Sequence, residues 1–229
     1  MENPDPIIVA LDFDDARDAA ALVERLGEHA GHYKVGLELL TTAGPGLARR
    51  LAEDGKGVFM DLKLFEIPNS VAGAVRACGR LGASMVTVHA SAGPAILSAA
   101  VEEASGFPGL KVIALTVVTS MTEADLTAVG VSSGVGEQVV RLASLARDCG
   151  CDGVVASPAE AGELRALLGP AAVIVTPGVS LPGASGEHVR TSSPGAAVRA
   201  GASHVVLGRG VTRSDDPVGV LAAVRAEFT

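Results

Sequence analysis

Short runs of aliphatic residues alternate with longer segments of amphipathic character along the whole 229-residue chain. The short runs have the length and apolarity of buried strands, and in the longer segments apolar side chains recur at the spacing of one helix face. The predicted strands are residues 7–12, 32–36, 58–61, 85–89, 112–117, 153–157, 172–176 and 204–208. The predicted helices are residues 16–29, 43–53, 69–81, 95–104, 136–148, 159–168, 195–200 and 217–228.

Eight strand-then-helix units in strict alternation predict an α/β fold with a parallel sheet, because parallel strands need a crossover that is usually helical. Without a composition break or linker, we expect one domain, residues 1–229, folded as a (β/α)8 barrel. An open flavodoxin- or Rossmann-like sheet is the alternative, but it calls for a glycine-rich turn after the first strand, where this chain has Asp12-Phe13-Asp14-Asp15. Asp14, Ser157 and Ser193 are candidate helix caps.

Polar residues gather at the carboxyl ends of the predicted strands, where such barrels place their chemistry. Asp61 and Lys63 are two positions apart, so in an extended backbone both side chains point the same way. A carboxylate beside an ammonium group is costly to desolvate, and proteins commonly arrange such a pair for catalysis. Lys34 ends the preceding strand. If these two strands are neighbours, two cations and one anion converge on a small volume.

Composition narrows the range of partners. The formal net charge is −8 and no run of Lys and Arg occurs, which argues against nucleic-acid binding, although a local group of cations can still bind a small anion.

No apolar run approaches the roughly 20 residues that span a bilayer, and the amino terminus is polar, so we expect no membrane segment or signal peptide. Three cysteines fit a reduced, cytoplasmic protein. No histidine or carboxylate pattern indicates a metal site.

Several segments together give the chain its resemblance to a known family. Residues 61–69 read Asp-Leu-Lys-Leu-Phe-Glu-Ile-Pro-Asn, and supporting matches lie at residues 8–13, 33–39, 115–121, 176–179 and 207–209. With these motifs the chain resembles the orotidine 5′-phosphate decarboxylases of the short bacterial type over nearly its whole length. Hexulose-phosphate synthases and keto-gulonate-phosphate decarboxylases are similar, use Mg²⁺ and share the D-x-K-x-x-D pattern, but they normally lack the following Ile-Pro-Asn.

The resemblance implies cofactor-free decarboxylation of orotidine 5′-monophosphate to UMP in pyrimidine nucleotide biosynthesis. Lys63 would stabilise the carbanion at C6 of the pyrimidine and then protonate it. Asp61 would hold Lys63, and Lys34 would keep Asp61 ionised. Glu66 occupies the position of the family's second acid, which reaches into the neighbouring subunit's site. A homodimer with shared active sites is therefore expected.

The same resemblance assigns nucleotide-binding roles around the strand ends. Asp12 and Ser70 would lie near the ribose, Ser120 would bind the amide edge of the pyrimidine, and Pro177 would pack near the ring. Gly208 and Arg209 would hold the phosphate, because the Arg fork can grip it in a bidentate manner. Residues 179–193 would form a lid, from which His188 would reach the phosphate.

Three of these residues depart from the family pattern. Glu66 replaces the usual Asp, Ser70 replaces Thr, and His188 stands where Gln is usual. The changes gather around the ligand, so two alternatives remain: a working decarboxylase, or a diverged paralog with another nucleotide or inhibitor specificity, including a nucleotide binder without turnover. Of the other histidines, we expect His89 to cap a helix or lie at the core edge, and His32 and His204 to be structural.

Overall fold

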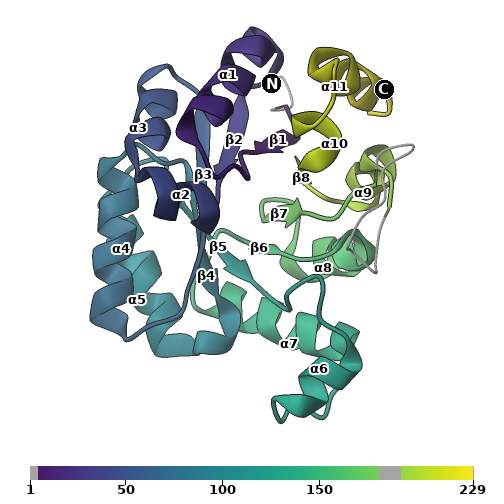
Figure 1. The fold of residues 1–229 in the computed structure, drawn as a ribbon. Helices are drawn as coiled ribbons and strands as arrows, with labels where there is room; N and C mark the ends of the chain where they lie inside the picture. The colour runs from purple at the N-terminus through teal and green to yellow at the C-terminus, as the bar shows by residue number, and fades with distance from the viewer. Residues whose placement is uncertain (1–4, 181–191, 229) are drawn as a thin grey trace.

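The computed structural model describes residues 5–180 and 192–228, and Figure 1 shows strands at the centre with helices around them. Eight parallel strands pair in chain order, and β8 closes on β1, so the predicted barrel is confirmed. The strands are β1 Ile7–Ala10, β2 His32–Val35, β3 Gly57–Leu64, β4 Met85–His89, β5 Lys111–Leu115, β6 Gly153–Val155, β7 Val173–Thr176 and β8 His204–Leu207.

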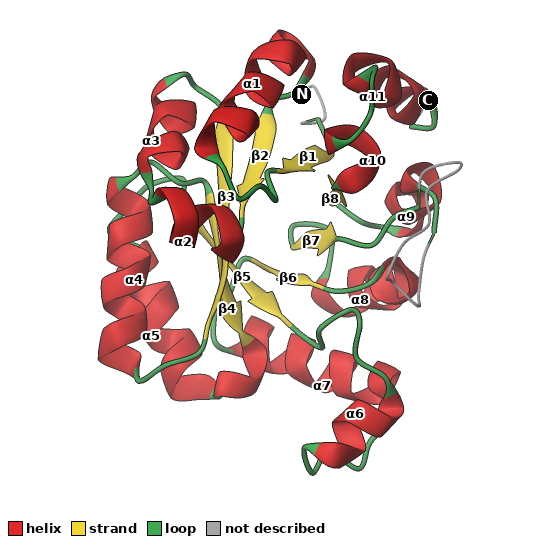
Figure 2. Cartoon of the chain, in the orientation of Figure 1, coloured by secondary structure: helices red, strands yellow, loops and turns green. Residues whose placement is uncertain are grey.

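Helices lie outside the barrel (Figure 2). They are α1 Ala16–Leu26, α2 Leu37–Ala43, α3 Gly46–Glu53, α4 Pro68–Arg80, α5 Pro94–Ala104, α6 Glu123–Ala128, α7 Val135–Asp148, α8 Ala161–Leu168, α9 Pro194–Ala200, α10 Arg209–Thr212 and α11 Pro217–Ala226. Single 3₁₀ turns add η1 Gly27–His29, η2 Ala90–Ala92 and η3 Pro158–Glu160. Within the described ranges, no helix is both long enough and apolar enough to cross a membrane.

Three short helices were not predicted. They are α2, α6 and α10, with seven, six and four residues. Each follows a strand directly or through a short loop, and a segment of one or two turns is too short for a helical period to emerge from its sequence. The prediction therefore found the helices that cover the barrel and missed those that shape the loops at its carboxyl end.

Side chains on each strand alternate between two apolar layers. In β1, Ile8 and Ala10 belong to the cluster inside the barrel, whereas Ile7 and Val9 belong to the cluster between barrel and helices. This period of two follows from the pleat of a strand. It directs every second side chain at the carboxyl ends of the strands into the barrel interior, where polar residues replace the aliphatic ones.

Strand β3 departs from the expected regular strand ending at residue 61. Met60 pairs with Val86 and Leu64 pairs with Val88, so four steps along β3 match two along β4 and the register shifts between them. Inside this bulge Lys63 has φ +50°, the only positive φ of a non-glycine residue in the described ranges. A bulge redirects side chains, and such bulges are common beside active sites.

Capping residues match the predictions in part. The side chain that caps α1 is Asp15, which accepts a hydrogen bond from the Arg17 amide, so the prediction of Asp14 was wrong by one position. Ser193 caps α9 as predicted. His89 caps η2 by accepting a hydrogen bond from the Ser91 amide, which confirms its expected capping role.

Candidate active site

Four charged side chains of alternating sign form a row at the carboxyl end of the barrel. Lys34 Nζ lies 2.9 Å from Asp12 Oδ1 and 3.5 Å from Asp61 Oδ2. Lys63 Nζ lies 2.8 Å from Asp61 Oδ1. The row arises because β1, β2 and β3 are neighbours in register, with Ala10 beside Lys34 and Lys34 beside Phe59. The convergence expected from the sequence is therefore present.

Exposure differs along this row, which we call the charge row and define as Asp12, Lys34, Asp61 and Lys63. The side chains of Lys34 and Asp61 are 12% and 13% exposed, whereas those of Lys63 and Asp12 are 37% and 51% exposed. The inner pair is thus nearly dry, and the outer two face the opening of the barrel. A ligand that enters from this end meets Lys63 and Asp12 first.

The ionisation of Asp61 reflects this setting. Burial raises the pKa of the Asp61 carboxyl, but the charges of Lys34 and Lys63 and hydrogen bonds from Lys63 and Thr87 outweigh it and hold the pKa below its usual value. Asp61 therefore stays a carboxylate between two ammonium groups. A fixed anion of this kind keeps Lys63 in place as a cation that can stabilise negative charge and give up a proton.

Two further residues shape the charge row and were missed from the sequence. Thr87 of β4 is fully buried, accepts a hydrogen bond from the Lys63 amide at 2.8 Å and donates one to Asp61 Oδ1 at 3.1 Å. A Cβ on Gly36 would lie 3.3 Å from both Asp12 Oδ1 and Lys34 Nζ. The alternation of side chains along β4 directs Thr87 inward, two residues before His89. A single threonine in an aliphatic strand does not by itself indicate a functional role, because its hydrogen-bond partners are distant in the sequence.

Five of the predicted nucleotide-binding residues, Asp12 among them, follow barrel strands at the same end of the barrel. Ser120 is exposed in the loop after β5, and Pro177 is half-buried directly after β7. Gly208 follows β8, and among the described residues no atom lies within 4 Å of where a side chain at this position would begin; exposed Arg209 opens α10. His188 and most of the predicted lid lie outside the described residues.

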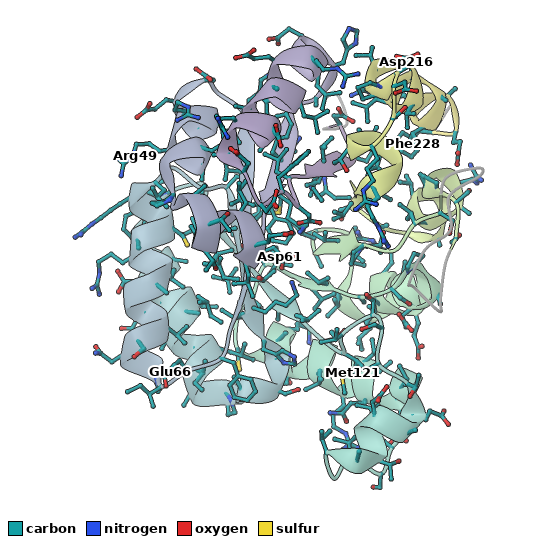
Figure 3. The ribbon with its side chains drawn as sticks, viewed as in Figure 1. Arg49, Asp61, Glu66, Met121, Asp216 and Phe228 are labelled. Atoms are coloured by element: carbon teal, nitrogen blue, oxygen red, sulfur yellow. The ribbon has the colours of Figure 1, made fainter. Side chains whose placement is uncertain are left out.

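Glu66 does not join the charge row within one chain. It is exposed in the loop between β3 and α4, and Figure 3 places it near α4 at the edge of the molecule, apart from Asp61 at the centre. Ser70 is exposed in the first turn of α4. Phe65 and Ile67, on either side of Glu66, are 60% and 61% exposed. Any role of Glu66 at an active site therefore depends on what covers this surface.

In the described ranges, no group of three or more His, Cys, Asp or Glu side chains is arranged to hold a metal ion. The charge row contains only two carboxylates, and both already pair with lysine ammonium groups. An ammonium group beside a carboxylate, as in Lys63 and Asp61, can donate a proton and stabilise negative charge.

Comparison with known proteins agrees with this geometry. The model of the "Orotidine 5'-phosphate decarboxylase / HUMPS family" matches residues 5–224. The orotidine 5′-phosphate decarboxylase of Moorella thermoacetica is 48% identical over 236 residues, covering 100% of this chain and 94% of the relative. That of Halorhodospira halophila is 46% identical, covering 100% of this chain and 98% of the relative.

Solved structures give the same result. The crystal structure of orotidine 5′-phosphate decarboxylase from Lactobacillus acidophilus has a TM-score of 0.87 and 33% sequence identity, covering 98% of this chain and 99% of the other. An uncharacterized conserved protein from Geobacillus kaustophilus has a TM-score of 0.86, also at 33% identity, covering 98% of this chain and 100% of the other. The resemblance inferred from the motifs is confirmed, and this chain belongs to the orotidine 5′-phosphate decarboxylase / HUMPS family.

Proposed function

We propose that this protein decarboxylates orotidine 5′-monophosphate to UMP without a cofactor, and that Lys63 is the proton donor. The single observation that carries the proposal is the charge row, in which Lys63 Nζ lies 2.8 Å from a buried carboxylate and also faces the barrel opening. The curated relatives that bear this activity in their names span the whole chain, which supports the same substrate.

The reaction needs negative charge to be stabilised at one carbon. The bond from C6 to the carboxylate breaks, CO₂ leaves, and the electron pair remains on C6. Lys63 stabilises this charge through its ammonium group and then donates a proton to C6, after which the amine regains a proton from water. Asp61 keeps Lys63 oriented before and during this step. Lys34, held between Asp12 and Asp61, keeps Asp61 ionised.

The remaining rim residues would bind the nucleotide. Exposed Asp12 can accept hydrogen bonds from ribose hydroxyls, and Ser120 can bind the amide edge of the pyrimidine. The backbone after Gly208 and the Arg209 guanidinium would hold the phosphate, in the position common to barrels of this kind. Pro177 would pack against the ring, His188 would reach the phosphate, and Ser70 would lie near the ribose.

The activity is tested by following the absorbance change of orotidylate on addition of the purified protein, with and without EDTA. We expect turnover that the chelator does not change. A Mg²⁺-dependent sugar-phosphate lyase of the same family would instead act on a sugar phosphate and lose its activity with the chelator. Binding of UMP without turnover of orotidylate would favour a diverged nucleotide-binding paralog.

We further propose a homodimer with shared active sites. Phe65 and Ile67 expose large apolar side chains on both sides of Glu66, and Leu37, which begins the helix after neighbouring strand β2, is 56% exposed. Burying these side chains against a second copy would remove apolar surface from water and carry Glu66 towards the partner's site.

The dimer is tested with Ile67→Asp, which should yield a monomer in sedimentation experiments and lower orotidylate turnover. Val129→Asp is the matched control, because Val129 is 68% exposed at the end of α6 and outside this surface. A wild-type monomer with full turnover at every protein concentration would contradict the proposal.

A further inference from the structure

Thr87 is a buried polar side chain that contacts two members of the charge row, Lys63 and Asp61. It lies in the middle of β4, its exposure is 0%, and the side chains before and after it on the same face are Met85 and His89. A buried hydroxyl without a partner is costly, and a buried hydroxyl with two partners fixes their geometry. Both partners of Thr87 belong to the short segment that carries the proposed chemistry.

The two hydrogen bonds of Thr87 assign its single proton. The Lys63 amide donates to Oγ1 at 2.8 Å, so the hydroxyl proton is free to go to Asp61 Oδ1 at 3.1 Å. The same Asp61 oxygen accepts from Lys63 Nζ at 2.8 Å. One hydroxyl thus holds Lys63 by its main chain and Asp61 by its carboxylate, and these two groups close a small ring of contacts.

The Lys63 backbone explains why such a hold is needed. With φ +50°, Lys63 adopts a left-handed conformation that is unfavourable for a residue with a Cβ. It lies in the β3 bulge, where the ladder to β4 is interrupted between Met60 and Leu64. There the Lys63 amide donates to a side chain of the neighbouring strand, the Thr87 hydroxyl. This bond holds the Lys63 backbone within the bulge, while the ion pair with Asp61 directs the Lys63 side chain.

We propose that Thr87 is a positioning residue for the decarboxylation, acting through Asp61 and Lys63 and making no contact with the nucleotide. The inference rests on the proposed function, in which Lys63 must meet C6 in one geometry. The proton of the Thr87 hydroxyl and one of its lone pairs already bind Asp61 and Lys63. Loss of this hydroxyl should therefore reduce the rate of the chemical step and leave nucleotide binding unchanged.

Three variants test the assignment. Thr87→Val keeps the shape and removes the hydroxyl, Thr87→Ser keeps the hydroxyl, and Thr116→Val is the matched control. Thr116 is also fully buried, but its hydroxyl donates to the Val155 carbonyl at 2.9 Å, away from the charge row. Thermal unfolding of all three variants shows whether each is folded at the assay temperature.

For Thr87→Val we expect kcat to fall about 10- to 100-fold, the range for losing one or two hydrogen bonds to a charged or strained group. The Kd for UMP should stay within about twofold, because UMP has no group at C6 that depends on Lys63 geometry. Thr87→Ser should recover kcat to within about threefold, and Thr116→Val should match the wild type. In the wild type the hydrogen bond from Thr87 lowers the pKa of Asp61, so its loss in Thr87→Val should raise this pKa. The acid limb of the kcat/KM profile should then move to higher pH.

An unchanged kcat in folded Thr87→Val would overturn the assignment, as would a Kd for UMP that rises in parallel with the loss of kcat. Failure of the proposed function gives a different result, namely no orotidylate turnover by the wild-type protein. In that case the positioning role is tested by measuring the pKa of Asp61 with carboxyl-carbon NMR, in the wild-type protein and in Thr87→Val. A raised pKa of Asp61 in the variant supports the positioning role, and an unchanged pKa refutes it.

Discussion

At the carboxyl end of the barrel interior the charge row pairs ionisable side chains of opposite sign, whereas at the amino end two histidine rings pack beside each other. The charge row places four groups of alternating sign in contact. At the other end, the rings of His32 and His204 open β2 and β8 with their centroids 5.7 Å apart. The Nδ1 atoms of both are buried, and neither has a hydrogen-bond partner in the described part of the chain.

The direction of the pKa shifts follows from this difference. The pKa of His204 is lowered to about 4, chiefly by burial and also by the charges of His32 and Lys111, while Asp5 and the Pro6 carbonyl act in the opposite direction. Burial also lowers the pKa of His32. Asp61 is buried too, yet its two ammonium neighbours keep it ionised. Burial alone thus neutralises a group, and burial with opposite charges in contact preserves its charge.

The amino end also shows how tightly the histidines are packed. A Cβ on Gly57 would come within 2.2 Å of His32 Cδ2, so only glycine at this position leaves room for the ring. His32 and His204 therefore pack closely at the amino end of the barrel, and their predicted structural role stays a prediction.

Removing the proton donor should produce the largest effect. Lys63→Ala should lower kcat for orotidylate by at least about 10³-fold, since the variant loses both the electrostatic stabilisation and the proton transfer. Lys111→Ala is the matched control, because exposed Lys111 begins β5 at the opposite end of the barrel. The absorbance change of orotidylate gives kcat for both variants and the wild type. An unaffected rate in Lys63→Ala would refute the assignment of the donor.

The charge row should also contribute to stability. Asp61→Asn leaves Lys63 without its carboxylate and Lys34 with one partner, and we expect the free energy of unfolding to fall by about 2 kcal/mol. Glu137→Gln, which breaks the exposed Arg141–Glu137 pair, should cost no more than about 0.5 kcal/mol. Urea unfolding at pH 7 measures both. If the free energy of unfolding of Asp61→Asn equals or exceeds that of the wild type, the charge row does not stabilise the fold.

The histidine end predicts a loss of stability in acid. The pKa of His204 is about 4 in the folded state against 6.5 for the free group, so the unfolded state binds a proton first as the pH falls. The stability is complete above pH 6.5 and falls between pH 6.5 and pH 4, by at most about 3 kcal/mol from this residue.

His204→Gln should flatten this pH dependence, and His29→Gln should leave it unchanged because His29 is exposed. Urea unfolding at pH 7, 6, 5 and 4.5 compares the two variants with the wild type. The same slope in His204→Gln as in the wild type would show that His204 is not the group that titrates.

The smallest expected effect concerns Glu66. If the acid at this position acts across a dimer, Glu66→Asp should raise kcat by about threefold or less, because the carboxylate moves by only one methylene. Glu53→Asp, on exposed α3 surface, is the matched control. Steady-state kinetics at a protein concentration that preserves the dimer gives the comparison, and an unchanged rate would mean that the longer side chain carries no penalty.

Much of the fold and part of the site could be predicted because they depend on local patterns. The alternation of strand and helix periods indicates eight parallel strands, and the positions at strand ends select Asp12, Lys34 and the Asp61-x-Lys63 pair. Parallel strands in chain order then bring these residues together with no further information. The argument for Asp61 and Lys63 assumed an extended backbone, which is wrong, because Lys63 is left-handed within a bulge.

What the tertiary structure alone decided is how that pair is held and what lies beside it. Thr87 is 24 residues from Lys63 along the chain and 26 from Asp61, and only the register of β3 against β4 brings its hydroxyl between them. Gly36 approaches Asp12 for the same kind of reason, across two strands. Periodicity specifies which face of a strand a residue occupies, but contacts between strands depend on their register. Here the register of β3 against β4 is set by a bulge that no local sequence pattern predicts.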